Sequence, residues 1–214
     1  MPRKKRIWYP GATYHIMSRG NRKMAVFLDP LDYVIFMEIL NNVKGRFPFL
    51  LHAACLMTNH FHLLMETIDT DPGKILQIFL STYAESFNRR HDFCGHLFEG
   101  RYTSCLVDSD RYFLEVSRYI HLNPVKAQIV KKPGAYKYSS YNLFVSEKRK
   151  PYTSSKNKIE TIMSQIVTTD RVLEFFGPKP LDEYRAFVEG ENSHADEEMM
   201  IQQDIRENNM WLPL

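Results

Sequence analysis

Cysteines are few and long apolar runs are missing in this 214-residue sequence, and each lack excludes a class of protein. The three cysteines, Cys55, Cys94 and Cys105, are widely spaced and form no CxxC pair, which argues against a disulfide framework and a thiolate zinc site. No apolar run approaches the roughly 18 residues that a membrane span needs. The N-terminal segment has no apolar stretch behind its charges, so it does not match a secretory signal. We therefore expect a cytoplasmic protein with no membrane partner.

The sequence also lacks the glycine-rich phosphate loop of nucleotide-binding enzymes, so no nucleotide cofactor is expected. Hydrophobic residues make up 44% and charged residues 25%, which is close to the globular norm and compatible with one domain plus a small appendix. The net charge of +3 is unevenly distributed, because acidic residues gather late in the chain. The basic groups are Arg3, Lys4, Lys5 and Arg6, then Arg19, Arg22 and Lys23, the pair Arg89 and Arg90, and Lys126, Lys131, Lys132 and Lys137. A basic body is typical of a protein that binds phosphates, although a solvated basic face is the simpler interpretation of charge alone.

Hydrophobic periodicity predicts an alternation of strands and helices. In chain order, the pattern predicts a strand over 13–18, a helix over 30–43, strands over 49–57 and 60–67, a helix over about 71–90, a strand over 96–107 and a helix over 112–121 that ends before Asn123-Pro124. This order is the split βαβ layout. The expected fold class is α+β, a ferredoxin-like antiparallel sheet with helices on one face.

The division of the chain follows from composition. Residues 1–145 form the expected catalytic domain, with an amphipathic piece over 135–145 packed beneath the sheet. The polar stretch 146–158 is typical of a linker. Residues 159–214 are expected to form a helical appendix with short helices over 159–166, 169–176 and 181–188, followed by a largely mobile acidic tail. Its few basic residues favour a packing or dimer-supporting role over a duplex-reading one.

The first candidate for chemistry is the segment His60-Phe61-His62. Residues two apart on a strand point to the same face, so the two imidazoles project together while Phe61 turns into the core. Paired imidazoles suit a divalent cation such as Mn²⁺ or Zn²⁺, and Mg²⁺ less naturally. A His-x-His pair alone is more often structural than a site.

The second candidate is the pair Tyr119 and Asn123, which share one face of a helix if the last turn continues. A tyrosine phenol, with an ordinary pKa of about 10, needs a nearby cation and a polarised phosphate to act as a nucleophile. The amide oxygen of Asn123 could complete a metal shell of two nitrogens and one oxygen. A core tyrosine and a helix cap before a proline are the alternative.

Taken together, the imidazole pair on a central strand and the phenol on the helix after the last strand suit a transesterification at phosphorus. The phosphotyrosine bond would keep the energy of the broken diester, so rejoining would need no nucleotide.

Three segments carry a resemblance to a known family. Tyr14-His15-Ile16-Met17-Ser18-Arg19-Gly20-Asn21, Met57-Thr58-Asn59-His60-Phe61-His62-Leu63-Leu64 and Arg118-Tyr119-Ile120-His121-Leu122-Asn123-Pro124-Val125-Lys126-Ala127 resemble the REP-associated tyrosine transposases, members of the single-tyrosine HUH transposases, as does Phe98-Glu99-Gly100-Arg101-Tyr102. The resemblance covers roughly residues 7–145. It implies a ferredoxin-like catalytic domain, a divalent metal ion (Mg²⁺ or Mn²⁺), and single-stranded or hairpin DNA as substrate. It also implies that His60 and His62 are metal ligands and Tyr119 is the nucleophile. Asn123 stands where related transposases have a glutamine ligand.

Further residues are candidates for DNA contacts. Arg19 and Asn21, in the turn after the first strand, could bind a phosphate or a base edge, and a simple turn role is equally open. Arg101 and Tyr102 could meet the backbone and stack on a base, with surface placement as the alternative. The arm Arg3, Lys4, Lys5 and Arg6 could enter a groove. His15 could approach the metal or a phosphate, although a hydrogen-bonded structural role is the plainer interpretation.

Three functions remain open at this stage. The favoured one is a DNA-cutting and rejoining enzyme, which can act as a monomer or a homodimer. The second is a non-catalytic hairpin-binding module of the same fold, which would not require both imidazoles and the phenol. The third is a metal-dependent hydrolase that uses water, with Tyr119 structural.

Overall fold

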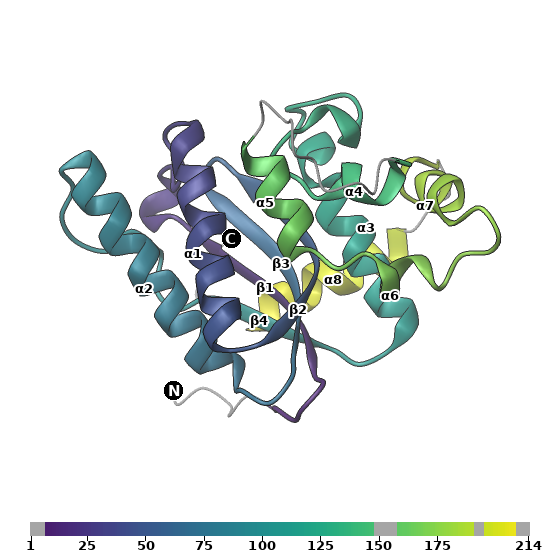
Figure 1. Ribbon diagram of the computed structural model, residues 1–214, viewed down its shortest axis with the longest axis horizontal. Coiled ribbons are helices and arrows are strands. Elements are labelled where there is room, and N and C mark those ends of the chain that lie inside the picture. Colours follow the sequence, from purple (N-terminus) through teal and green to yellow (C-terminus); the bar gives the residue numbers. More distant parts are fainter. Residues whose placement is uncertain (1–6, 148–157, 191–194, 209–214) are drawn as a thin grey trace.

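The computed structural model describes residues 7–147, 158–190 and 195–208 (Figure 1). The sheet strands are β1 (Thr13–Arg19), β2 (Phe49–Met57), β3 (His60–Thr67) and β4 (Thr103–Val107). The larger helices are α1 (Pro30–Arg46), α2 (Pro72–His91), α3 (Asp110–Lys126), α5 (Lys158–Ile166), α7 (Pro180–Glu189) and α8 (Ala195–Asn208). Shorter elements are α4 (Tyr141–Val145), α6 (Asp170–Leu173) and the 3-10 turns η1 (Asn21–Lys23) and η2 (Pro133–Ala135).

The four strands form one antiparallel sheet in the order β2-β3-β1-β4. This confirms the α+β, ferredoxin-like expectation. The two central strands are β3 and β1, and β1 pairs with β3 on one side and with β4 on the other. Their register pairs Met17 with His62 and Arg19 with His60. The histidine pair therefore lies beside the end of β1, next to the basic turn that follows it.

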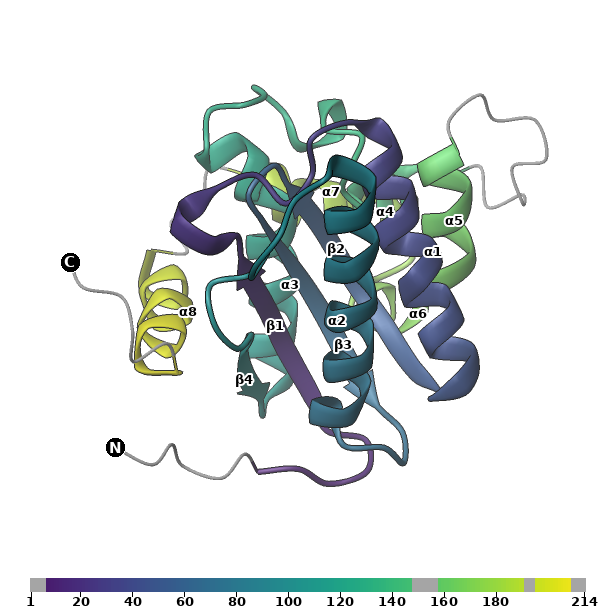
Figure 2. The ribbon, with the colours of Figure 1, turned by 90° about the vertical axis from the view of Figure 1, so that its left-hand side faces the viewer.

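The sheet separates two hydrophobic clusters because alternate side chains point to opposite faces. Phe61 and Ile16 lie on one face, in the core formed with α1, α2 and α5. Leu64 and Cys55 lie on the other face, in the core formed with α3 and α7. Figure 2 shows α2 in front of the sheet and α3 behind it. Helices were expected on one face of the sheet, and α1 and α2 cover that face. Helix α3 covers the second face, toward which His60 and His62 project.

Local sequence explains where two helices begin. The Asp29 carboxylate caps α1 by accepting hydrogen bonds from the backbone N–H groups of Leu31 and Asp32. The Asp32 carboxylate in turn accepts from the backbone N–H of Asp29, so the two residues form a capping box. Pro30 stands at the first helical position, where no N–H is needed. Ser109 caps α3 through the N–H of Tyr112.

Helix α3 continues beyond the expected end at residue 121, through Pro124 to Lys126. A proline inside a helix removes only one backbone hydrogen bond directly, here the one that would reach the carbonyl of residue 120. The next bonds form again, because the N–H of Ala127 reaches the carbonyl of Asn123. The extra turn keeps Asn123 on a helix, one turn after Tyr119.

One other expectation was wrong. The strand predicted over 96–107 begins only at Thr103, and residues 96–102 form a loop held by a bond from the N–H of Glu99 to the carbonyl of Arg19. The piece over 135–145 packs against the sheet as expected, with Tyr136, Tyr141 and Phe144 in the second core; its residues 141–145 form α4. Helix α8 lies in the acidic tail, over which no helix was predicted.

The outer edge of β2 is covered by the chain itself. The N–H of Leu56 bonds to the carbonyl of Tyr138, and the N–H of Ser140 bonds to the carbonyl of Ala54. Further along, the N–H of Thr168 bonds to the carbonyl of Leu51. Within the parts of the chain described, no helix combines the length and the apolar character needed to cross a membrane.

Candidate active site

The two imidazoles of β3 project into a pocket of about 240 Å³. The ring centroids of His60 and His62 lie 5.1 Å apart with the planes nearly perpendicular, at 88°. The pocket is lined by Met17, Ser18, Arg19, His60, His62, Glu99, Arg101, Thr103, Tyr119, Asn123 and Ile205. The structure thus brings His60, His62, Tyr119 and Asn123 together within one chain.

Asn59 fixes the orientation of His60. The side-chain amide of Asn59 donates to the backbone carbonyl of Lys23 at 3.2 Å, which identifies its other atom as the oxygen. That oxygen lies 2.7 Å from Nδ1 of His60 and can only accept, so Nδ1 carries the hydrogen. A neutral His60 therefore presents its unprotonated Nε2 as a metal-binding lone pair. In the sequence, Asn59 stands out only as part of the segment over 57–64 that carries the family resemblance.

His62 has a histidine as its neighbour instead. Its Nδ1 lies 3.0 Å from Nε2 of His15, and the two rings are stacked with centroids 5.2 Å apart. His15 lies on β1, is fully buried, and does not line the pocket. The structure therefore puts His15 behind His62, outside the pocket lining.

Burial keeps these imidazoles neutral. Desolvation lowers the pKa of His15 to about 3 and, with help from the charge of Arg19, lowers the pKa of His60 to about 4. Desolvation also lowers the pKa of His62 well below its ordinary value, and the neighbouring His60 and His15 add to this. A neutral imidazole is the form that ligates a metal, so the site is prepared for a cation at neutral pH.

Tyr119 faces the imidazoles from α3. Its ring centroid is 5.8 Å from that of His62 and 5.8 Å from that of His15, both edge-on. The ammonium of Lys126 lies 4.8 Å from the centroid of the Tyr119 ring. The phenol is therefore held between buried imidazoles and a positive charge.

Asn123 is oriented by its own helix. Its side-chain NH₂ donates to the carbonyl of Tyr119 at 2.9 Å, which turns the amide oxygen away from that carbonyl. Since Asn123 lines the pocket, its oxygen is the polar atom available there. Two imidazole nitrogens and one amide oxygen fit a divalent cation of borderline softness, such as Mn²⁺, and leave coordination positions for phosphate oxygens.

The mouth of the pocket carries opposite charges. Arg19 forms an ion pair with Glu99, with an N–O distance of 3.2 Å and both side chains partly exposed. Arg101 lines the same mouth, and Ile205 of α8 reaches it from the C-terminal part of the chain. Sequence reasoning missed Glu99 and Ile205 as pocket residues. The segment Phe98-Glu99-Gly100-Arg101 contained the only signal for Glu99.

The other predicted DNA-binding residues lie elsewhere. Asn21 is exposed in η1, with its backbone N–H bonded to the carbonyl of Leu97, and it does not line the pocket. Tyr102 is only 8% exposed and lines a separate groove beside α2, so the structure does not bring it to the pocket. Arg3, Lys4, Lys5 and Arg6 lie outside the described residues.

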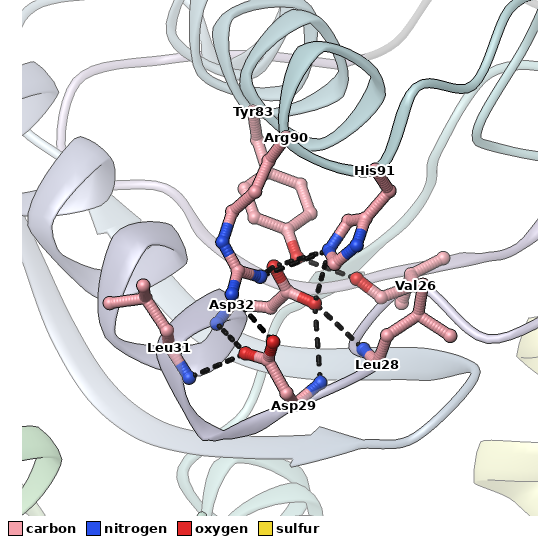
Figure 3. A network of polar contacts seen from close by, with 8 residues as sticks. All are labelled: Val26, Leu28, Asp29, Leu31, Asp32, Tyr83, Arg90 and His91. Carbon is pink, nitrogen blue, oxygen red and sulfur yellow. Dashed lines mark hydrogen bonds and ion pairs between the residues drawn. The ribbon is translucent and has the colours of Figure 1, made fainter.

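A second polar cluster joins the beginning of α1 to the end of α2 (Figure 3). Asp29, Asp32 and His91 have the spacing of metal ligands. However, Arg90 bonds to both carboxylates at 2.5 Å, and His91 bonds to Asp32 at 3.0 Å. The guanidinium already supplies the positive charge that these carboxylates require. This cluster is an ion-pair network that connects two helices.

Comparison with known proteins gives this geometry a family. The family model "Transposase IS200 like" matches residues 9–123, just over half of the chain, and the chain belongs to that family of transposases. A search of curated proteins finds no match.

One solved structure supports the fold. The chain is similar to a structure described as a REP-associated tyrosine transposase bound to a REP hairpin, with 17% sequence identity and a TM-score of 0.59 over 74% of this chain and 93% of that one. A putative transposase from Deinococcus radiodurans R1 is 18% identical, with a TM-score of 0.40 over 56% of this chain and 95% of that one. At such identity the first similarity establishes the fold alone.

Proposed function

We propose that this transposase cuts single-stranded DNA beside a hairpin and transfers the cut strand through a covalent 5′-phosphotyrosine at Tyr119, in a reaction that depends on a divalent cation. The observation that carries the proposal is the pocket itself. Two neutral imidazoles, an oriented amide oxygen and a phenol line one cavity of about 240 Å³. A purely binding module would require no such convergence.

His60, His62 and Asn123 would hold the cation, Mn²⁺ or Mg²⁺. When bound, it would polarise the scissile phosphate and offset the charge that develops on its oxygens. His60 and His62 would offer Nε2 to the cation, and Asn59 already sets the tautomer of His60 that leaves its Nε2 unprotonated. Their burial excludes water and strengthens the interaction with a cation.

Tyr119 acts as the nucleophile. Its oxygen attacks phosphorus and loses its proton, the bond from phosphorus to the 3′ oxygen breaks, and that oxygen leaves as a hydroxyl after taking up a proton. Lys126 stabilises negative charge on the phenolate from beside the ring. The new bond is a phosphodiester like the old one, so attack by another 3′ hydroxyl reverses the step and joins a new strand without a nucleotide.

The DNA class follows from charge and family. Arg19 and Arg101 at the mouth of the pocket suit a phosphate backbone. The transposase of similar fold is described as bound to a REP hairpin, and we extend this substrate class to the present chain. Affinity should fall steeply with salt because each phosphate contact releases counterions.

The test is incubation of the protein with an end-labelled single-stranded oligonucleotide that contains a hairpin, in the presence of Mn²⁺ or Mg²⁺. We expect a DNA–protein adduct that survives denaturation and is absent in Tyr119→Phe. Tyr138→Phe, which removes a hydroxyl away from the pocket, is the matched control and should form the adduct normally. His60→Ala should still bind the DNA and form no adduct.

The outcomes separate the remaining alternatives. Binding without cleavage in the wild-type protein would favour a hairpin-binding module. Cleavage that releases two free DNA ends in both wild type and Tyr119→Phe would favour a water nucleophile and reject Tyr119.

A further inference from the structure

His15 is a buried histidine that the mechanism so far does not use. It stands on β1, opposite Leu64 of β3 and Cys105 of β4, in the middle of the sheet. It is fully buried, and its Nε2 lies 3.0 Å from Nδ1 of His62. Its position outside the pocket lining means that it cannot coordinate a cation there directly.

Two neutral imidazoles can share one hydrogen in only two ways. If His15 donates from Nε2, then Nδ1 of His62 accepts, and His62 carries its own hydrogen on Nε2. A protonated Nε2 has no lone pair and cannot bind a metal. If His62 donates from Nδ1, its Nε2 is free to ligate, and His15 must carry its remaining hydrogen on Nδ1.

We propose that His15 is a positioning residue, whose Nε2 accepts the Nδ1 hydrogen of His62 and so keeps Nε2 of His62 available to the cation. The proposal rests on the proposed metal centre. It assigns to His15 the part that Asn59 has for His60, so each ligand has its own partner behind it. Metal-binding histidines generally donate their second ring N–H to such a partner, which fixes both tautomer and ring orientation.

Within the described residues, Nδ1 of His15 is buried without a hydrogen-bond partner, so the arrangement leaves the hydrogen on that nitrogen without an acceptor. Ligation of the cation by His62 has to outweigh this cost. His121, which is also fully buried, instead uses both nitrogens, one with Tyr184 and one with Ser140. Among the residues that the structure describes, His62 is the one polar partner of His15, and the stacked His15 ring restrains the plane of the His62 ring.

The test measures metal binding without DNA, by titrating Mn²⁺ into the full-length protein and following the free ion by electron paramagnetic resonance. His15→Leu keeps the volume but removes the acceptor, and should weaken Mn²⁺ binding by about 10- to 100-fold. His15→Gln offers an amide oxygen at a similar reach and should restore affinity to within about threefold of wild type, by the same reasoning.

His52 provides the matched control. It is fully buried in β2, which β3 separates from β1, and it bonds to Glu66 at 2.9 Å, away from the pocket. His52→Leu and His52→Gln remove an equally buried imidazole, so any loss of affinity that they share with His15→Leu is structural. Equal Mn²⁺ affinity in His15→Leu and wild type would overturn the proposal.

A second measurement needs no variant and remains decisive if His15→Leu fails to fold. Long-range ¹H–¹⁵N correlation of the wild-type protein with Zn²⁺ reports which ring nitrogen carries a hydrogen. We expect Nδ1 of His62 to be protonated and Nε2 of His15 to be unprotonated. A protonated Nε2 on His15 in the metal-bound protein would reject the arrangement.

The two proposals fail differently. A wild-type protein that binds neither Mn²⁺ nor Zn²⁺ would remove the metal centre, and His15 would lose its role with it. If wild type binds the metal and forms the Tyr119 adduct, but affinity is insensitive to His15, only the inference about His15 fails.

Discussion

Asn59 orients His60, a candidate metal ligand, through a single hydrogen bond, and the loss of this bond should be measurable. Asn59→Ala leaves Nδ1 of His60 without its acceptor, so the ring can rotate and exchange tautomers. We expect about a 10- to 100-fold loss in Mn²⁺ affinity and in the rate of adduct formation. Asn59→Asp keeps an acceptor and should lose much less. Equal activity in Asn59→Ala and wild type would show that His60 is oriented by other contacts.

Glu99 places a negative charge where the DNA backbone is expected, and it also forms an ion pair with Arg19. Glu99→Gln removes the charge and releases the guanidinium for a phosphate. We expect hairpin DNA to bind roughly three- to tenfold more tightly at low salt, with a smaller gain at high salt. Fluorescence anisotropy at two salt concentrations measures this. Weaker binding in Glu99→Gln would mean that the ion pair itself presents Arg19 to the DNA.

The candidate ligands and nucleophile could be found from sequence because each relies on a local period. His60 and His62 share a face at a spacing of two on a strand, and Tyr119 and Asn123 share one at a spacing of four on a helix. The contacts behind them could not be found in this way. His15 meets His62 only through the pairing of β1 with β3, and Glu99 meets Arg19 only through a loop that the periodicity assigned to a strand.

At the scale of elements, Arg90 connects α1 to α2. It bonds to Asp29 and to Asp32, and the carboxylate of Asp32 is only 1% exposed. Arg90→Met would leave that buried carboxylate with only His91 and backbone N–H groups as partners. We expect the midpoint of thermal unfolding to fall by roughly 5 to 10 °C.

A control for this change comes from an exposed ion pair that connects α1 to α5. Lys158 bonds to Glu38 of α1 at 2.7 Å, with side chains 65% and 43% exposed. Lys158→Met should shift the midpoint by about 1 °C or less, because exposed pairs contribute little. Similar shifts in Arg90→Met and Lys158→Met would contradict a structural role for the Arg90 network.

Element boundaries failed where tertiary contacts overrode local signals. Asn123-Pro124 reads as a helix end, yet α3 continues to Lys126, with Ile120, His121 and Pro124 itself buried. The loop 96–102 alternates like a strand but is held away from strand geometry, with Gly100 at a φ of 70°. The acidic tail showed too little periodicity to predict α8, although Ile201 is buried against the second core.

For the whole molecule, buried histidines predict how stability depends on pH. The folded pKa of His15 and of His121 is lowered to about 3 by burial, whereas an unfolded histidine titrates near 6.5. The unfolded chain therefore binds more protons below pH 6.5, so their stabilising contribution is complete above that pH and is lost as the pH falls toward 3. His60, with a pKa lowered to about 4, acts in the same direction.

Each such histidine should reduce the free energy of unfolding by at most about 1.4 kcal/mol per pH unit below 6.5. Urea unfolding at pH 7 and pH 5, with a chelator present, should show a loss of several kcal/mol. An unchanged free energy of unfolding would mean that these imidazoles are accessible to protons in the folded state.

The fold class could be predicted for the whole molecule because strands and helices alternate in an order that few topologies satisfy. The strand order and the antiparallel pairing follow from that order. The predicted fold class put the helices on one face of the sheet, whereas α3 covers the opposite face from α1 and α2. An amphipathic pattern does not specify which face of a sheet a helix covers. For the same reason, the sequence did not show that α5 packs into the first core and that α6 and α7 pack into the second.

Because the chain's own segments already satisfy the backbone groups along β2, recruitment of a second molecule by strand addition there is disfavoured. An incoming strand would have to displace intramolecular hydrogen bonds between segments that folding has already ordered. Any assembly of two copies on a paired DNA substrate must then be organised by other surfaces or by the nucleic acid itself. Because His60, His62, Asn123 and Tyr119 line one pocket of a single chain, the proposed reaction would need no exchange of helices between copies.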